Sequence, residues 1–126
     1  MQGYLLVFFG AGIGGALRHG VNLAALRLLP NGIGIGTLFV NVIGCFAMGV
    51  LIEMLALKTG ATQAQRLFLA TGVLGGFTTF SAFAIETVLL HERGQLAWAA
   101  ANVIASVVLC IAAAVGGLVL VRSLTA

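Results

Sequence analysis

Hydrophobic and polar positions alternate along this chain on the scale of whole helices. Four long apolar runs cover residues 4–29, 33–57, 64–90 and 95–121, and the short polar breaks between them are PNG at 30–32, KTGATQ at 58–63 and HERG at 91–94. A helix needs about 20 residues to cross a bilayer, so each run is long enough to span a membrane. The pattern predicts an all-α integral membrane protein in which residues 1–126 form a single domain of four transmembrane helices.

Composition supports a membrane location and narrows the possible partners. The chain is 61% hydrophobic and only 7% charged, whereas soluble domains carry about 25% charged residues. Its six basic residues are dispersed, which excludes nucleic acid as a partner. The sequence contains no paired carboxylates, metal-ligand cluster or nucleophile with a base, so we expect no enzyme. We expect a multi-pass protein of the cell's inner (plasma) membrane, surrounded by lipid.

The distribution of basic residues gives a weak signal for orientation. An even number of spans puts both termini on one side, together with Lys58, Arg66 and Arg122, and puts Arg27 and Arg93 on the other side. A bias of three to two hardly fixes the orientation by the positive-inside rule. Two interpretations remain open: copies insert both ways and pair as an antiparallel homodimer, or the weak bias suffices for one orientation.

The third run contains a stretch poorly suited to the centre of a membrane helix, GGFTTFSAF at 75–83. Glycines and hydroxyl-bearing residues can break a helix at mid-membrane where the freed backbone lies inside protein. The two half-helix ends would then present carbonyl oxygens to a cation and amide N–H groups to an anion. A tolerated kink explains the composition equally well, so both interpretations remain open.

Two phenylalanines in this stretch, Phe80 and Phe83, are three residues apart and share a helical face with Gly76 and Thr87. Such a pair usually serves packing. The edge of a phenyl ring carries the positive part of its quadrupole, however, so rings turned edge-on to a narrow path could contact an anion.

Neutral polar side chains form one stripe in the second run and one in the fourth. The members of each stripe are four residues apart; they are Thr37, Asn41 and Cys45 in the second run, and Asn102, Ser106 and Cys110 in the fourth. Residues at this spacing lie on one helix face. The stripes either hold the helices together by hydrogen bonds or line a path for an ion that needs hydrogen bonds without a fixed countercharge.

Two charged residues lie within the apolar runs. Arg18 is deep in the first run, where a charge is costly and usually faces protein or a water-filled cavity. We expect a structural or vestibule role for it, with His19 and Asn22 beside it, rather than snorkelling to the interface. Glu86 lies about five residues from the end of its run and could be a proton relay, a partner for a basic group or an interfacial residue.

The stretch GAGIGG at 10–15 formally matches a dinucleotide-binding fingerprint. That fingerprint needs an acidic residue about 20 positions later, whereas the first acidic residue is Glu53. Gly10 and Gly14 have the spacing that lets membrane helices approach closely. We therefore expect helix packing here rather than a nucleotide site.

Taken together, these stretches resemble the Fluc (CrcB) family of fluoride channels over essentially the full chain. The matching segments are GAGIGGALRHG, GTLFVNVIGCFAMG, TGVLGGFTTFSAFAIET and AAANVIAS. The resemblance implies a dual-topology antiparallel homodimer with two pores along its interface, through which fluoride leaves the cytoplasm passively and selectively. It also implies a structural Na⁺ at the dimer centre, held by the main-chain carbonyls of Gly75 and Thr78.

The resemblance further assigns roles to individual side chains. Phe80 and Phe83 match the pore phenylalanines of the family, and Asn41 matches its pore asparagine. The polar lining of the pore matches Thr37, Ser81, Asn102 and Ser106, while Arg18 and Glu86 match the arginine of the first helix and the glutamate of the third. Three positions depart from the family pattern by lacking a usual hydroxyl: Ala82, Cys110 and Ala114.

Two rival functions fit a four-span chain of this length. A small multidrug-type cation/proton antiporter needs a membrane-buried carboxylate, characteristically in the first helix, where this chain has Arg18 and no acid. A non-transporting membrane assembly subunit would use its polar residues only to hold helices together.

Overall fold

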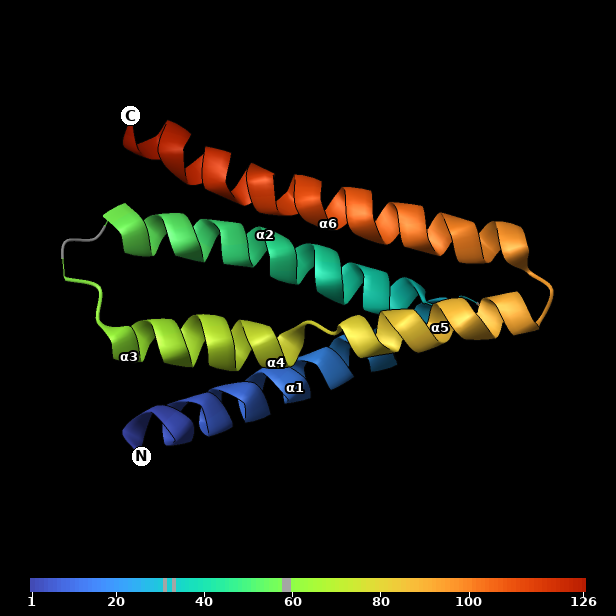
Figure 1. Ribbon diagram of the computed structural model, residues 1–126, viewed down its shortest axis with the longest axis horizontal. Helices are drawn as coiled ribbons and strands as arrows, with labels where there is room; N and C mark the ends of the chain where they lie inside the picture. Colours follow the sequence, from blue (N-terminus) through green and yellow to red (C-terminus); the bar gives the residue numbers. More distant parts are fainter. Residues whose placement is uncertain (31, 33, 58–59) are drawn as a thin grey trace.

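The computed structural model describes residues 1–30, 32, 34–57 and 60–126. Four helical segments are each long and apolar enough to cross a membrane: α1 (Gln2–Leu28), α2 (Ile35–Leu57), a composite third span (Gln63–Glu92) and α6 (Leu96–Thr125). They lie side by side, with both termini at one end (Figure 1). The prediction of an all-α, four-span membrane protein is confirmed. Ile33, the expected start of the second span, and Lys58, counted among the basic residues, lie outside the described residues.

The third span is built from four consecutive elements: α3 (Gln63–Arg66), η1 (Leu67–Leu74), α4 (Gly75–Phe77) and α5 (Phe80–Glu92). It begins with a capping box, in which Thr62 Oγ1 accepts the Gln65 amide at 3.3 Å and Gln65 Oε1 accepts the Thr62 amide at 3.1 Å. η1 is π-helical, a wide geometry often found at functional sites. Thr78 (ψ 157°) and Thr79 (ψ 119°) are extended, so of the two interpretations of residues 75–83 the break is confirmed and the tolerated kink is wrong.

Glycines of α1 allow a close approach to the third span. Gly10 and Gly14 are buried. A Cβ on Gly10 would lie 2.6 Å from the carbonyl oxygen of Phe68, and one on Gly14 would overlap the carbonyl oxygen of Val73 and lie 2.7 Å from the amide of Phe77. Because α1 is a continuous helix through these glycines, the strand-to-helix turn of a dinucleotide site is absent from it. The helix-packing interpretation is confirmed.

Gly14→Ala should therefore destabilise the protein by about 1 to 3 kcal/mol, because the added methyl meets backbone atoms that cannot rotate away. Gly12→Ala is the matched control, since a Cβ there has no neighbouring atom within 4 Å. Thermal unfolding in detergent measures both variants. Equal unfolding temperatures for Gly14→Ala and Gly12→Ala would contradict the close approach of α1 to the third span.

Helices α2 and α6 run in the same direction and pack closely along their length (Figure 1). Small residues set their register, because a Cβ on Gly49 would overlap the carbonyl oxygen of Ala114 and one on Gly117 would overlap that of Phe46. One turn beyond Gly49, Glu53 accepts a bond of 2.9 Å from Arg122. Because Gly49 and Ala114 are in contact, residues at successive steps of four before Gly49 on α2 lie level with those at the same steps before Ala114 on α6. The two polar stripes are therefore at matching levels along the two helices. The resulting pairs are Cys45 with Cys110, Asn41 with Ser106 and Thr37 with Asn102.

Candidate functional site

The break between α4 and α5 has both of its helix ends capped. The Thr78 amide and the Thr78 hydroxyl each donate to the carbonyl oxygen of Leu74 at 3.0 Å and so complete the end of α4. Thr79 Oγ1 accepts the amide of Ala82 at 3.2 Å, as an N-cap does at the start of α5, and lies 3.2 Å from Ser81 Oγ. The break is thus a defined junction of two helices rather than a bend in a continuous one.

Asn41 fastens this junction to α2. Its Nδ2 donates to the carbonyl oxygen of Thr79 at 2.9 Å, and its Oδ1 accepts the Thr79 amide at 2.8 Å. The carboxamide therefore replaces the helical partners that the extended Thr79 has lost. A carboxamide has two N–H donors, so one N–H of Asn41 remains for another partner. Asn41 can therefore hold the helices together through Thr79 and still offer a hydrogen bond to an ion, so both interpretations of the polar stripe on α2 are compatible at this residue.

Arg18 reaches the same junction from α1. Its Nη1 donates to the carbonyl oxygen of Thr78 at 3.4 Å, and the residue is half-buried. The charge thus faces protein backbone at the break, as expected for an intramembrane arginine with a structural role. Asn22 lies one turn further on, where a Cβ on Gly36 would be 2.9 Å from its Oδ1.

A cavity of about 320 Å³ opens beside the break. Phe80 and Phe83 line it with their rings 5.3 Å apart and tilted by 57°. The Phe80 side chain is 78% exposed in the single chain. The other described residues of the lining are uncharged and come from α2, the break and α6: Asn41, Cys45, Thr78, Thr79, Ser106, Val107, Cys110 and Ile111.

A second polar cluster lies nearer the start of α2. Thr37 Oγ1 donates to Glu86 Oε1 at 2.6 Å, and Asn102 Nδ2 donates to Thr87 Oγ1 at 2.9 Å. A Cβ on Gly34 would lie 3.4 Å from Glu86 Oε2 and 3.3 Å from Asn102 Oδ1. In the part of the chain that the structure describes, Glu86 Oε2 is buried without a hydrogen-bond partner. The carboxyl group of Glu86 is thus bonded to α2 within the helix bundle, and its role as a proton relay, a partner for a basic group or an interfacial residue stays a prediction.

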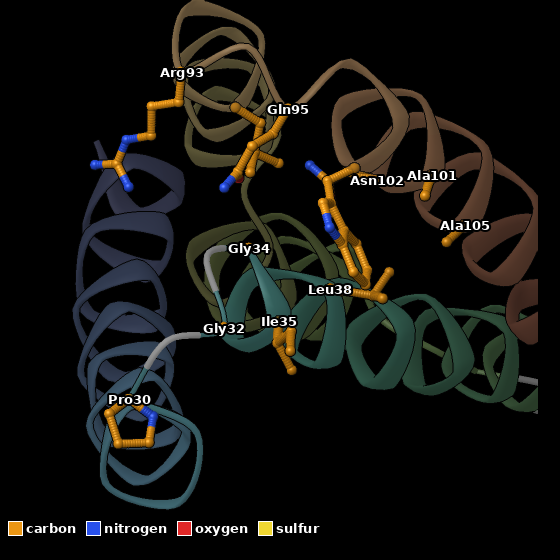
Figure 2. Close-up of a pocket in the computed structure, with 12 residues that line it drawn as sticks. Pro30, Gly32, Gly34, Ile35, Leu38, Arg93, Gln95, Ala101, Asn102 and Ala105 are labelled. Atoms are coloured by element: carbon orange, nitrogen blue, oxygen red, sulfur yellow. The ribbon is translucent and has the colours of Figure 1, made fainter.

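This cluster borders a larger cavity of about 620 Å³ at the end of the molecule where α5 meets α6. Figure 2 shows Gly34 and Ile35 on the α2 side of this cavity, and Arg93, Gln95 and Asn102 on the side formed by the end of α5 and the start of α6. Asn102 and Ala105 line the larger cavity, and Ser106 one residue later lines the smaller one. Polar groups therefore follow the α2–α6 contact from the larger cavity to the break.

The residues predicted for an ion path are divided between the two levels. Asn41, Phe80, Phe83 and Ser106 share the smaller cavity, Thr37 and Asn102 belong to the Glu86 cluster, and the exposed Ser81 lies beside the break. Sequence reasoning missed Thr79, which caps α5 and binds both polar ends of Asn41. The available signal was a threonine shortly after a glycine pair, because threonine is a preferred N-cap residue for the helix that follows.

The structure is a four-span helical bundle whose third span is broken at mid-length, beside an uncharged polar cavity. These features define a class of protein, namely membrane proteins that move ions or small solutes. Backbone departs from helix within a membrane only where protein or an aqueous cavity surrounds it, and discontinuous helices present ion-binding groups there.

The chain belongs to the CrcB family. The family model described as "CrcB-like protein, Camphor Resistance (CrcB)" matches residues 5–118. A relative from Granulibacter bethesdensis, named fluoride-specific ion channel FluC, is 56% identical, with 98% of each chain covered. Proteins of the same name from Methylobacterium nodulans (52% identical; 97% of this chain and 98% of the relative) and Paracoccus denitrificans (51%; 98% and 97%) are similar over equally long stretches.

Proposed function

We propose that this protein is a fluoride-selective ion channel of the inner (plasma) membrane that lets fluoride leave the cytoplasm passively. The observation that carries the proposal is the cavity beside the break. It combines two phenyl rings with hydrogen-bond donors and has no charged side chain among its described lining residues. The nearly full-length similarity to proteins named fluoride-specific ion channels supports the choice of ion.

Fluoride is small and strongly hydrated, so a narrow path must replace the hydrogen bonds of its water shell. Ser106 Oγ and the free N–H of Asn41 are donors that can do so. The ring edges of Phe80 and Phe83 add a weak attraction. Because no fixed positive charge holds the anion in this cavity, binding stays weak enough for release, which conduction requires.

The pore is expected to be completed by a second, antiparallel copy. In the single chain, Gly75, Phe80 and Ser81 are exposed at the level of the break. Next to them Thr78 has extended backbone and is only half-buried, and such backbone is tolerated within a membrane where protein or an aqueous cavity surrounds it, which supports a second copy covering this face. An antiparallel homodimer brings the two breaks together at its centre and gives two equivalent paths. Reporter fusions to the C-terminus should then report both sides of the membrane, and a single orientation would contradict dual topology.

The same junction offers oxygen ligands for a structural Na⁺ at the dimer centre. The Thr79 amide, which would bond Gly75 O in a continuous helix, donates to Asn41 instead, and this frees the Gly75 carbonyl. Among the described residues, Thr78 O accepts a bond of 3.4 Å from Arg18 Nη1, and it has a second lone pair. The carbonyl ends of broken helices coordinate Na⁺ in other membrane proteins. Two copies would together supply four such oxygens.

Removing sodium should weaken the dimer. At a sodium concentration about one hundred times the dissociation constant, the ion would stabilise the assembly by about 2.7 kcal/mol. We expect a lower dissociation temperature in N-methyl-D-glucamine buffer than in sodium buffer of equal ionic strength. Identical temperatures in the two buffers would rule out a structural sodium ion.

A cation/proton antiporter and a non-transporting assembly subunit are the rivals. α1 has no acidic residue and carries Arg18, and Glu86 of α5 is half-buried and bonds Thr37. Liposomes loaded with fluoride and a pH dye separate the three functions. A channel gives fluoride efflux that valinomycin accelerates in potassium buffer. A cation/proton antiporter gives no fluoride efflux, but the pH dye reports proton movement when a substrate cation is added outside, and an assembly subunit gives neither signal.

A further inference from the structure

The two cysteines of the chain lie next to each other across the α2–α6 contact. Cys45 on α2 and Cys110 on α6 both line the smaller cavity, and both are half-buried free thiols. The contact of Gly49 with Ala114 fixes the register one turn further on and brings the two cysteines to the same level. The sequence contains no other cysteine, so this pair is its whole thiol content.

The surroundings of the pair select a particular class of ligand. Sulfur ligands prefer soft metal ions. Among the described residues, no group of three or more His, Cys, Asp or Glu side chains could hold a metal. These residues therefore supply too few ligands for an ion that requires tetrahedral or octahedral coordination. Soft monovalent ions of the Cu⁺ and Ag⁺ type form stable linear complexes with two sulfur ligands. The neighbouring Asn41 and Ser106 offer only hard, neutral groups.

We propose that Cys45 and Cys110 form a two-thiol site for a soft monovalent metal ion, and that the occupied site closes the ion path. On binding, each thiol loses its proton to water and forms one sulfur–metal bond, with no change in oxidation state. Two thiolates with one monovalent ion carry a net charge of −1 into a cavity whose described lining is otherwise neutral. This charge repels an anion, and the metal narrows the cavity.

Direct binding tests the site without reference to transport. Purified protein is titrated with Ag⁺ in chloride-free nitrate buffer, and the bound metal is counted by native mass spectrometry. We expect one Ag⁺ per chain. Cys45→Ser and Cys110→Ser should each weaken binding by about a hundredfold or more, because one of two ligands is lost.

A displaced-thiol variant is the matched control. Cys110→Ser combined with Val108→Cys keeps two thiols, but a step of two residues turns the second one to nearly the opposite side of α6, where Val108 is exposed. It should bind Ag⁺ as weakly as the single variants. Wild-type affinity in the displaced-thiol variant or in either single variant would overturn the two-thiol site, and so would the absence of Ag⁺ binding to the wild-type protein.

The closure part of the inference rests on the proposed fluoride channel and needs a second experiment. External Ag⁺ should slow fluoride efflux from liposomes that hold the wild-type protein, glutathione should restore it, and Cys45→Ser should resist the block. Bound Ag⁺ with unchanged efflux would overturn closure. An absence of fluoride efflux before any Ag⁺ is added would contradict the channel, while the binding titration would still decide the metal site.

Discussion

Replacing Asn41 with alanine should destabilise the protein by about 2 kcal/mol or more, because it leaves the buried amide and carbonyl of Thr79 without partners. It should also slow fluoride efflux by roughly tenfold or more, since losing one donor to an ion costs at least about 1.4 kcal/mol. Thermal unfolding in detergent and efflux from liposomes measure the two effects. No other side chain described here bonds both polar groups of a residue in the break.

Asn102→Ala is the matched control for stability. Asn102 is the corresponding carboxamide of the α6 stripe, but it donates to a side chain, Thr87 Oγ1, so its loss exposes no backbone group. Its effect on unfolding should stay at about 1 kcal/mol or less. If Asn41→Ala and Asn102→Ala unfolded at the same temperature, Asn41 would not fasten the break.

Phe80→Ile and Phe83→Ile should impair fluoride conduction while leaving the protein folded and dimeric. Isoleucine keeps the apolar bulk of the ring and removes its positively polarised edge. Phe80 is largely exposed in the single chain, so folding does not depend on it. We expect fluoride efflux to fall by roughly tenfold in each variant, on the scale of about 1.4 kcal/mol for the lost ring contact.

A second aromatic pair provides the control. Phe8 and Phe9 on α1 have ring centroids 5.4 Å apart, and neither lines the cavity beside the break. Phe8→Ile should leave efflux unchanged. Wild-type efflux in both Phe80→Ile and Phe83→Ile would reduce the cavity rings to packing, and a loss in Phe8→Ile would show that the substitution acts through the fold.

The helices themselves could be predicted from the sequence. The expected spans 4–29 and 95–121 became Gln2–Leu28 and Leu96–Thr125, and 64–90 became Gln63–Glu92. Hydropathy determines which segments enter lipid, so errors remain only at the ends, where flanking polar residues extend the helices. Residues 75–83 stand out in the sequence because glycine pairs and hydroxyls are unfavourable in a lipid-facing helix, but composition alone left a break and a tolerated kink equally open.

The tertiary partners could not be predicted in the same way. The α2–α6 register depends on contacts such as Gly49 with Ala114, but a chain with 18 glycines offers many equivalent small-residue contacts. The pairing of Asn41 with Thr79 requires that register together with a break at one particular peptide. The π-helical geometry of η1 likewise has no period that distinguishes it in an apolar run. These features arise from packing between spans rather than from any one span.

Reconstitution into liposomes tests the central claim most directly, that the polar cavity beside the broken helix of each chain conducts fluoride and rejects chloride. The initial rate of efflux is measured with an ion-selective electrode for fluoride and, in matched vesicles, for chloride, with valinomycin dissipating the membrane potential in both. We predict rapid fluoride efflux and a chloride rate no greater than that of protein-free vesicles. Equal rates for the two anions, or no fluoride efflux from vesicles containing folded protein, would contradict the account.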